Sequence, residues 1–183
     1  LSRYMTERNT LRTDLNAATR ARHDALDSKL SPLAEGSHYG QFLRIQYAVR
    51  APVESWLAAH VTDPVPPMQT ALIREDLHEL GVQPDCNLPT FDAEDPREAW
   101  GIAWTLAGSS LGNRALLHQR RKAGLRGADR FLGDEAMPRY WTEFRPRIEV
   151  PMDDATHQHA IRGARRVFDI FLAVHRSATE RAA

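Results

Sequence analysis

The stretch that decides the fold is WGIAWTLAGSSLGNRALL, residues 100–117. Apolar residues recur at helical spacing on both flanks, yet Gly108 and Gly112 lie inside, and each costs a helix about 1 kcal/mol relative to alanine. Because they are four residues apart, the two glycines share one helix face. This pattern predicts that a large, flat body approaches the backbone. It is either a crossing helix or a planar cofactor that would have Ser109 and Ser110 beside it.

A second constellation lies near the amino terminus, in the sequence TRARHDALD, residues 19–27. His23 shares a helical stripe with apolar residues, which predicts an imidazole that points inward. Such a histidine is either a core residue bonded to a neighbour or a metal ligand. Asp27 lies one turn later, where it could accept the proton of the ring nitrogen that does not bind metal. Arg20 is expected to reach the rim of the domain and meet a carboxylate.

Helical periodicity extends over the rest of the chain, and no run of alternating or β-branched residues indicates a strand. We expect an all-α, single-domain, multi-helical bundle over residues 6–180, with residues 1–5 as a flexible leading segment outside it. Pro32 should end the first helix, and Pro52 should kink or break the second. The expected helices span residues 6–30, 37–60, 68–80, 96–122, 139–149 and 153–179.

The amino-acid composition excludes several classes of function for this protein. The 183 residues carry a formal net charge of zero, which favours neither nucleic acid nor anionic lipid as a partner. Cys86 is the one cysteine, so a disulfide within the chain, a cysteine-based zinc site and an iron–sulfur cluster are excluded. No apolar run reaches the length of about eighteen residues that a membrane helix needs. We therefore expect a cytoplasmic protein with no membrane partner.

Together the two constellations resemble the heme oxygenase family. Residues 19–27 resemble its proximal helix, and Gly108-Ser-Ser-Leu-Gly112 resembles the distal-helix motif of the bacterial, biliverdin-producing branch that includes enzymes encoded near phytochromes. The order and separation of the motifs, the helix number and the length also agree. The resemblance covers residues 10–178.

The resemblance implies an oxidoreductase that cleaves heme with O2 to biliverdin, CO and Fe2+. Heme would be both substrate and cofactor, with His23 as its axial iron ligand. Gly108, Ser109 and Gly112 would form the catalytic distal face, and Asp27 and Ser110 would assist cofactor binding. Electrons would come from an external reductase or ferredoxin, and a phytochrome-linked signalling system is a candidate partner.

Some positions depart from the family pattern. Asn16 and Ala103 stand where residues that hold the heme propionates are usual, and Ser109 stands where many members carry aspartate. Guanidinium groups pair well with carboxylates and could replace the missing contacts. The candidates are Arg20, Arg162, Arg165 and Arg166.

Two alternatives remain open. The departures would suit a catalytically degenerate relative that acts as a heme sensor or as a protein-interaction and signalling module. Glu75-x-x-His78 matches half of a di-iron carboxylate site, but such sites need a second unit on a facing helix, and the sequence offers none.

Overall fold

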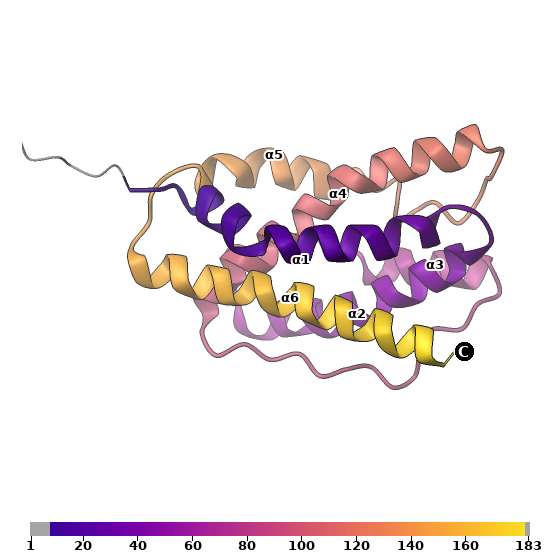
Figure 1. Ribbon diagram of the computed structural model, residues 1–183, viewed down its shortest axis with the longest axis horizontal. Coiled ribbons are helices and arrows are strands. Elements are labelled where there is room, and N and C mark those ends of the chain that lie inside the picture. Colours follow the sequence, from indigo (N-terminus) through magenta and orange to yellow (C-terminus); the bar gives the residue numbers. More distant parts are fainter. Residues whose placement is uncertain (1–7, 182–183) are drawn as a thin grey trace, which may run out of the picture.

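The computed structural model describes residues 8–181, and this part of the chain is an all-helical bundle (Figure 1). The leading segment expected at residues 1–5 lies outside the described residues. Residues 8–181 form six α-helices and two short 3-10 turns, at Gly36–His38 and Pro96–Glu98. The α-helices are α1 (Leu11–Ala34), α2 (Tyr39–His60), α3 (Thr70–Glu79), α4 (Ala99–Lys122), α5 (Ala136–Ile148) and α6 (Asp154–Glu180).

The helices begin where local chemistry satisfies their free amide groups. The Thr10 hydroxyl accepts from Thr13 N at 3.2 Å, and the Asp153 carboxylate accepts from Thr156 N at 2.9 Å. The helix expected from residue 6 therefore begins at Leu11, and α6 begins where the sequence placed it. At the end of α3, Gly81 has a φ of +67°, as a glycine C-cap requires.

Pro32 does not end α1, and Pro52 does not break α2. Pro32 lies within the last turn of α1 rather than ending the helix, and Pro52 lies inside an α2 that runs unbroken to His60. Each proline removes an amide that would donate to the carbonyl four residues earlier, that of Ser28 or Ala48, yet the helix continues past it. The end of α1 also receives help from tertiary structure, since Arg120 Nη1 donates to Ala34 O at 3.3 Å.

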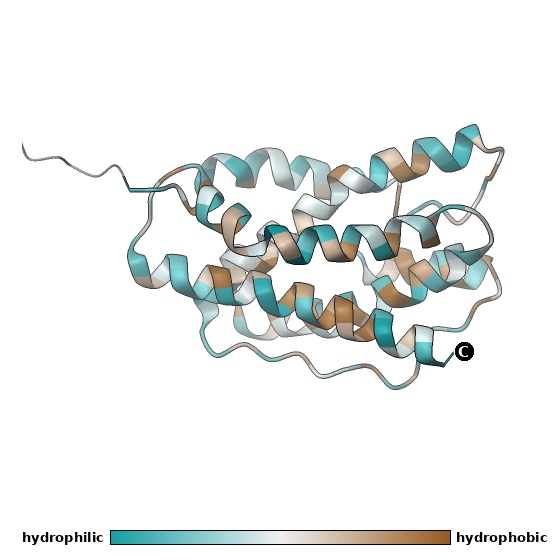
Figure 2. Cartoon of the chain, in the orientation of Figure 1, coloured by the Kyte–Doolittle hydropathy of each residue, from teal (hydrophilic) through white to brown (hydrophobic). Residues whose placement is uncertain are grey.

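Two apolar clusters hold the bundle together. The larger joins α1, α2, α3, α4 and α6, whereas the smaller lies where the amino-terminal half of α1 meets α4, α5 and α6. Trp104 packs against both. Figure 2 shows hydrophobic and hydrophilic residues alternating along α1 and α6, as expected for amphipathic helices with one buried face.

Glycine does permit one close helix crossing, between α4 and α6. A Cβ on Gly101 would stand 1.7 Å from Ala160 O, and a Cβ on Gly163 would stand 2.1 Å from Glu98 O. No side chain fits at either place. This crossing fixes the amino-terminal half of α4 and leaves its carboxyl-terminal half to extend along the upper side of α1 in Figure 1.

No helix of the described chain is both long and apolar enough to cross a membrane.

Candidate functional site

His23 lies at the edge of the buried stripe of α1 and not within it. Its side chain is 64% exposed, which corrects the expectation that the imidazole points inward. Thr19, one turn earlier, is buried, and the ring of Phe168 from α6 lies edge-on to the imidazole with the centroids 6.3 Å apart. The imidazole is therefore supported on one side by the core and accessible on the other.

Two ion pairs hold the helix that carries His23. Arg22 Nε donates to Asp169 Oδ1 of α6 at 2.7 Å, and the neighbouring His23 ring also lies beside α6, at Phe168. Arg12 lies close to three full turns before His23 and bonds to Glu149 after α5 at 2.7 Å. These two ion pairs hold α1 against α6 and against the end of α5.

The ring-nitrogen partner differs from the expectation. His23 Nδ1 lies 3.4 Å from Asp24 Oδ1, whereas Asp27 accepts from Ser31 Oγ at 3.0 Å. The carboxylate beside His23 Nδ1 is therefore that of Asp24, and Asp27 bonds to Ser31 instead. Among the described residues, the hydrogen bonds recorded for His23 involve Nδ1 alone. Nε2 is left for another ligand.

The glycine segment of α4 is open on its outer side. A Cβ added to Gly108 or Gly112 would meet no atom within 4 Å, so no described helix crosses there. The crossing-helix interpretation is therefore wrong for these glycines; the crossing occurs at Gly101 instead. Leu111 on the same segment is 59% exposed although it is apolar. Glycine and an exposed leucine together form a face that is flat, apolar and uncovered.

The two serines of the motif have different roles. Ser110 is buried, and its hydroxyl donates to Ala107 O at 2.7 Å within its own helix, so it does not face the open side as expected. Ser109 is exposed and donates to Leu106 O at 2.7 Å. Its hydroxyl also accepts from Arg50 Nη2 of α2 at 2.7 Å.

Arg50 was not predicted from the sequence as part of the site. This side chain is fully buried, and burial lowers the pKa of its guanidinium to about 10, which still leaves the group charged at neutral pH. A signal was available: Gln46, Arg50 and Glu54 are polar residues at four-residue steps in a helix that is otherwise apolar on that side. Such a polar stripe in a core indicates a hydrogen-bonded network.

The arginines expected at the rim are used unequally. Arg166 Nε donates to Glu98 at 2.8 Å and its Nη2 to Glu94 at 2.7 Å, so two carboxylates already occupy it. Arg165 is exposed, with one long contact from Nε to Ala18 O at 3.4 Å. Arg20 and Arg162 are also exposed. Of the four candidates, Arg166 is thus the least able to receive a further anion.

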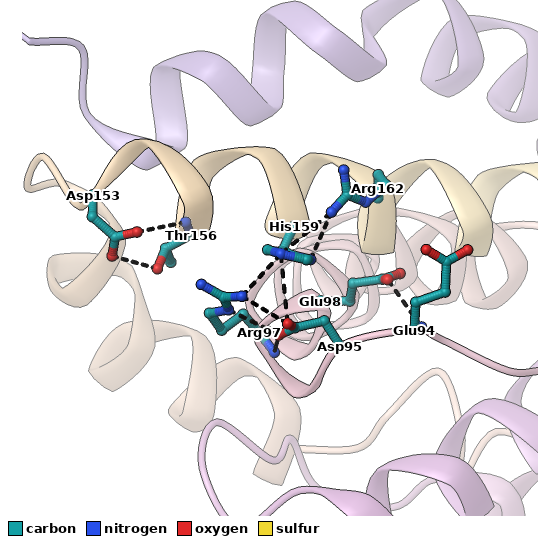
Figure 3. Close-up of polar contacts among 8 residues, drawn as sticks. All are labelled: Glu94, Asp95, Arg97, Glu98, Asp153, Thr156, His159 and Arg162. Atoms are coloured by element: carbon teal, nitrogen blue, oxygen red, sulfur yellow. Dashed lines mark hydrogen bonds and ion pairs between the residues drawn. The ribbon is translucent and has the colours of Figure 1, made fainter.

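Arg162 belongs to a polar cluster where α6 passes the start of α4 (Figure 3). Its Nη2 lies 2.7 Å from His159 Nδ1, and Arg97 Nη2 lies 3.0 Å from His159 Nε2. Arg97 also donates to both oxygens of Asp95, and this contact holds the pKa of Asp95 well below its ordinary value. His159 therefore lies between two guanidinium groups, with Asp95 Oδ2 3.5 Å from its Nε2, so both ring nitrogens already have partners.

The half di-iron motif, Glu75-x-x-His78, also lies beside an arginine, Arg130. Arg130 Nε lies 3.4 Å from Glu75, and the same guanidinium reaches Glu79 at 2.5 Å and buried Asp76 at 3.1 Å. Across residues 8–181, no group of three or more histidine, cysteine or carboxylate side chains is placed to hold a metal ion. Arg130 therefore already pairs with the carboxylate of the half motif, Glu75.

Comparison with known proteins decides the fold. No protein-family model matches the sequence, and no curated protein matches it. Among solved structures, the NO- and CO-bound heme oxygenase from Neisseria meningitidis superimposes with a TM-score of 0.71 at 24% identity, over 92% of each chain. This chain has the heme oxygenase fold. The architecture expected from the two motifs is thereby confirmed, and the activity of the chain is a separate question.

Proposed function

We propose that this heme oxygenase-like chain binds heme between His23 of α1 and the Gly108–Gly112 face of α4. The single observation that supports this most strongly is the open glycine face, where an added Cβ would meet nothing within 4 Å. Two helix-breaking residues in a helix interior, with no neighbour to explain them, suit a planar ligand that contacts backbone. The exposed imidazole of His23 would bind the iron from the other side of the ring.

The residues of this chain fit the group. A neutral imidazole binds iron through one nitrogen while the other is hydrogen-bonded, and His23 has Nδ1 beside Asp24 with Nε2 left over. The uncovered Leu111 would supply apolar contact to the porphyrin. Exposed Arg20, Arg162 and Arg165 would receive the propionates in place of the usual residues. Arg166 is left out because Glu94 and Glu98 occupy it.

The activity proposed is O2-dependent opening of heme to biliverdin, CO and Fe2+. Heme would supply the redox chemistry, and the protein would supply binding, orientation and exclusion of competing reactions. The absence of side chains at Gly108 and Gly112 would allow the ring to lie close to the α4 backbone. A reductase or ferredoxin as electron donor, a cytoplasmic location and a phytochrome-linked signalling role stay predictions.

The experiment is a hemin titration of the wild-type chain and of His23→Ala, followed by absorption spectroscopy. We expect a sharp Soret band for the wild type and a shifted, weaker band for His23→Ala. His118→Ala serves as the matched control, because His118 is an exposed histidine on α4 outside the motif. A His23→Ala spectrum equal to the wild-type spectrum would rule out His23 as the ligand.

Addition of a reductant under oxygen tests the activity. Loss of the Soret band with formation of biliverdin supports an oxygenase, whereas a stable band despite tight binding supports the second candidate, a heme sensor or signalling module. One observation favours that second candidate: Ala103, at a position where the family usually contacts a propionate, is fully buried and cannot touch a ligand.

A further inference from the structure

Arg50 of α2 is a buried cation with an unfilled hydrogen-bonding position. Its Nε donates to Gln46 Oε1 at 3.1 Å, its Nη2 donates to Ser109 Oγ at 2.7 Å, and its guanidinium carbon lies 5.0 Å from the centre of the Phe131 ring. Nη1 is buried and has no acceptor among the described residues. A buried guanidinium N–H without an acceptor lowers the stability of the fold, so we expect this nitrogen to have a hydrogen-bond partner.

The complementary atom is the side-chain oxygen of Gln69, which is buried and has no donor within residues 8–181. The Gln69 backbone amide donates to Glu54 at 2.8 Å, and its side-chain amide donates to Asp134 at 2.7 Å. Glu54 and Asp134 are also the two carboxylates whose charges favour the protonated form of Arg50. The unfilled donor and the unfilled acceptor thus belong to one polar cluster between α2 and the start of α3.

We propose that Arg50 is a positioning residue that anchors α4 at Ser109, and that an internal water completes its hydrogen bonds. The water accepts from Arg50 Nη1 and donates to Gln69 Oε1. Water is the one common partner that can do both, and internal waters typically occupy such polar sites. The negative charges of Glu54 and Asp134 favour the protonated form of Arg50 in this cluster.

The anchor acts on a part of α4 that has little packing on its outer side. Gly108 and Gly112 lower the helix propensity of this segment, and nothing packs on their outer side. Ser109 lies between them in sequence and is tied to the core through Arg50. The importance of this anchor for ligand binding rests on the proposed function, whereas the anchor itself does not.

Hydrogen–deuterium exchange of residues 106–113 tests the anchor in the protein without hemin. The variants are Ser109→Ala, Arg50→Met and the double variant, with Ser110→Ala as the matched control because Ser110 bonds only within its own helix. We expect Ser109→Ala to raise exchange in this segment by about two- to tenfold, as the loss of one hydrogen bond predicts. Peptides from α6 should keep their wild-type rates.

The double variant separates anchoring from a general loss of stability. If Arg50 acts on the segment through Ser109, the double variant exchanges there no faster than Arg50→Met alone. Additive effects, or equal exchange in Ser109→Ala and Ser110→Ala, would overturn the proposal. Should Arg50→Met fail to fold, the comparison of the two serine variants decides the matter.

A high-resolution crystal structure tests the water. Density bonded to both Arg50 Nη1 and Gln69 Oε1 is expected, and a Gln69→Met variant should lose it. Absence of that density in the wild type would overturn this part of the proposal. Hemin titration of Ser109→Ala adds the link to function, with an expected loss of affinity of about two- to tenfold. Failure of the wild type to bind hemin would refute the proposed function and leave the exchange result intact.

Discussion

The α-carbon of Gly101 faces the carbonyl oxygen of Ala160 so closely that a Cβ at position 101 would stand 1.7 Å from that oxygen. The contact brings the backbones of α4 and α6 together and sets the direction of α4. Gly112, on the same helix, has nothing within 4 Å of an added Cβ. Substitution of the two glycines by alanine should therefore have opposite effects on the stability of the protein.

Gly101→Ala should destabilise the protein by about 3 kcal/mol or more, because the rigid backbone of α6 must move to admit the methyl group. Urea denaturation of the purified chain measures the change in unfolding free energy. An unfolding free energy equal to that of the wild type would show that α4 and α6 do not cross this closely.

Gly112→Ala should stabilise the protein without hemin by about 0.5–1 kcal/mol, since alanine has the better helix propensity and meets no neighbour. The same variant should bind hemin more weakly, because the methyl group would occupy the proposed contact surface. Denaturation and hemin titration are both required. Gain of stability with unchanged hemin affinity would move the proposed site away from this glycine.

Asp76→Ala should cost about 3 kcal/mol or more of stability. The Asp76 carboxylate is fully buried and accepts from Arg130 N at 3.1 Å and from Phe131 N at 2.9 Å, so it fixes the segment between α4 and α5. Glu75→Ala is the control: its carboxylate is 61% exposed, and a change within about 0.5 kcal/mol is expected. Equal effects of the two variants would contradict the prediction.

Stability should fall on acidification in a window set by His175 of α6. Burial, helped by the charge of Lys29, lowers the pKa of His175 below its ordinary value of 6.5. The unfolded chain therefore binds the proton more readily, so this contribution is complete above about pH 6.5 and is lost as the pH falls through the folded-state pKa. His175→Gln should flatten the dependence of unfolding free energy on pH between about 7.5 and 5.5. A wild-type slope in that variant would exclude this cause, and His118→Gln provides the control.

The helices and their approximate bounds could be predicted from the sequence because their signals are local. Apolar spacing marks the buried face of α6, and the Asp153 cap marks its start. The start of α3 could not be placed in the same way. Its first amide groups bond to Glu54 of α2, at 2.8 Å from Gln69 N and 3.0 Å from Thr70 N, so a residue distant in sequence supplies the cap.

The candidate site was likewise predictable only where its signals are local in the sequence. By itself, the sequence determined the helical class, the positions of His23 and of the glycine motif, and the heme oxygenase-like fold that this pair indicates. Only the tertiary structure decided that His23 is exposed beside Asp24, that Arg166 is occupied by two glutamates, and that Arg50 reaches Ser109 through the core. The physical reason is that helix periodicity is a property of neighbouring residues, whereas exposure and hydrogen-bond partners depend on which helices pack together.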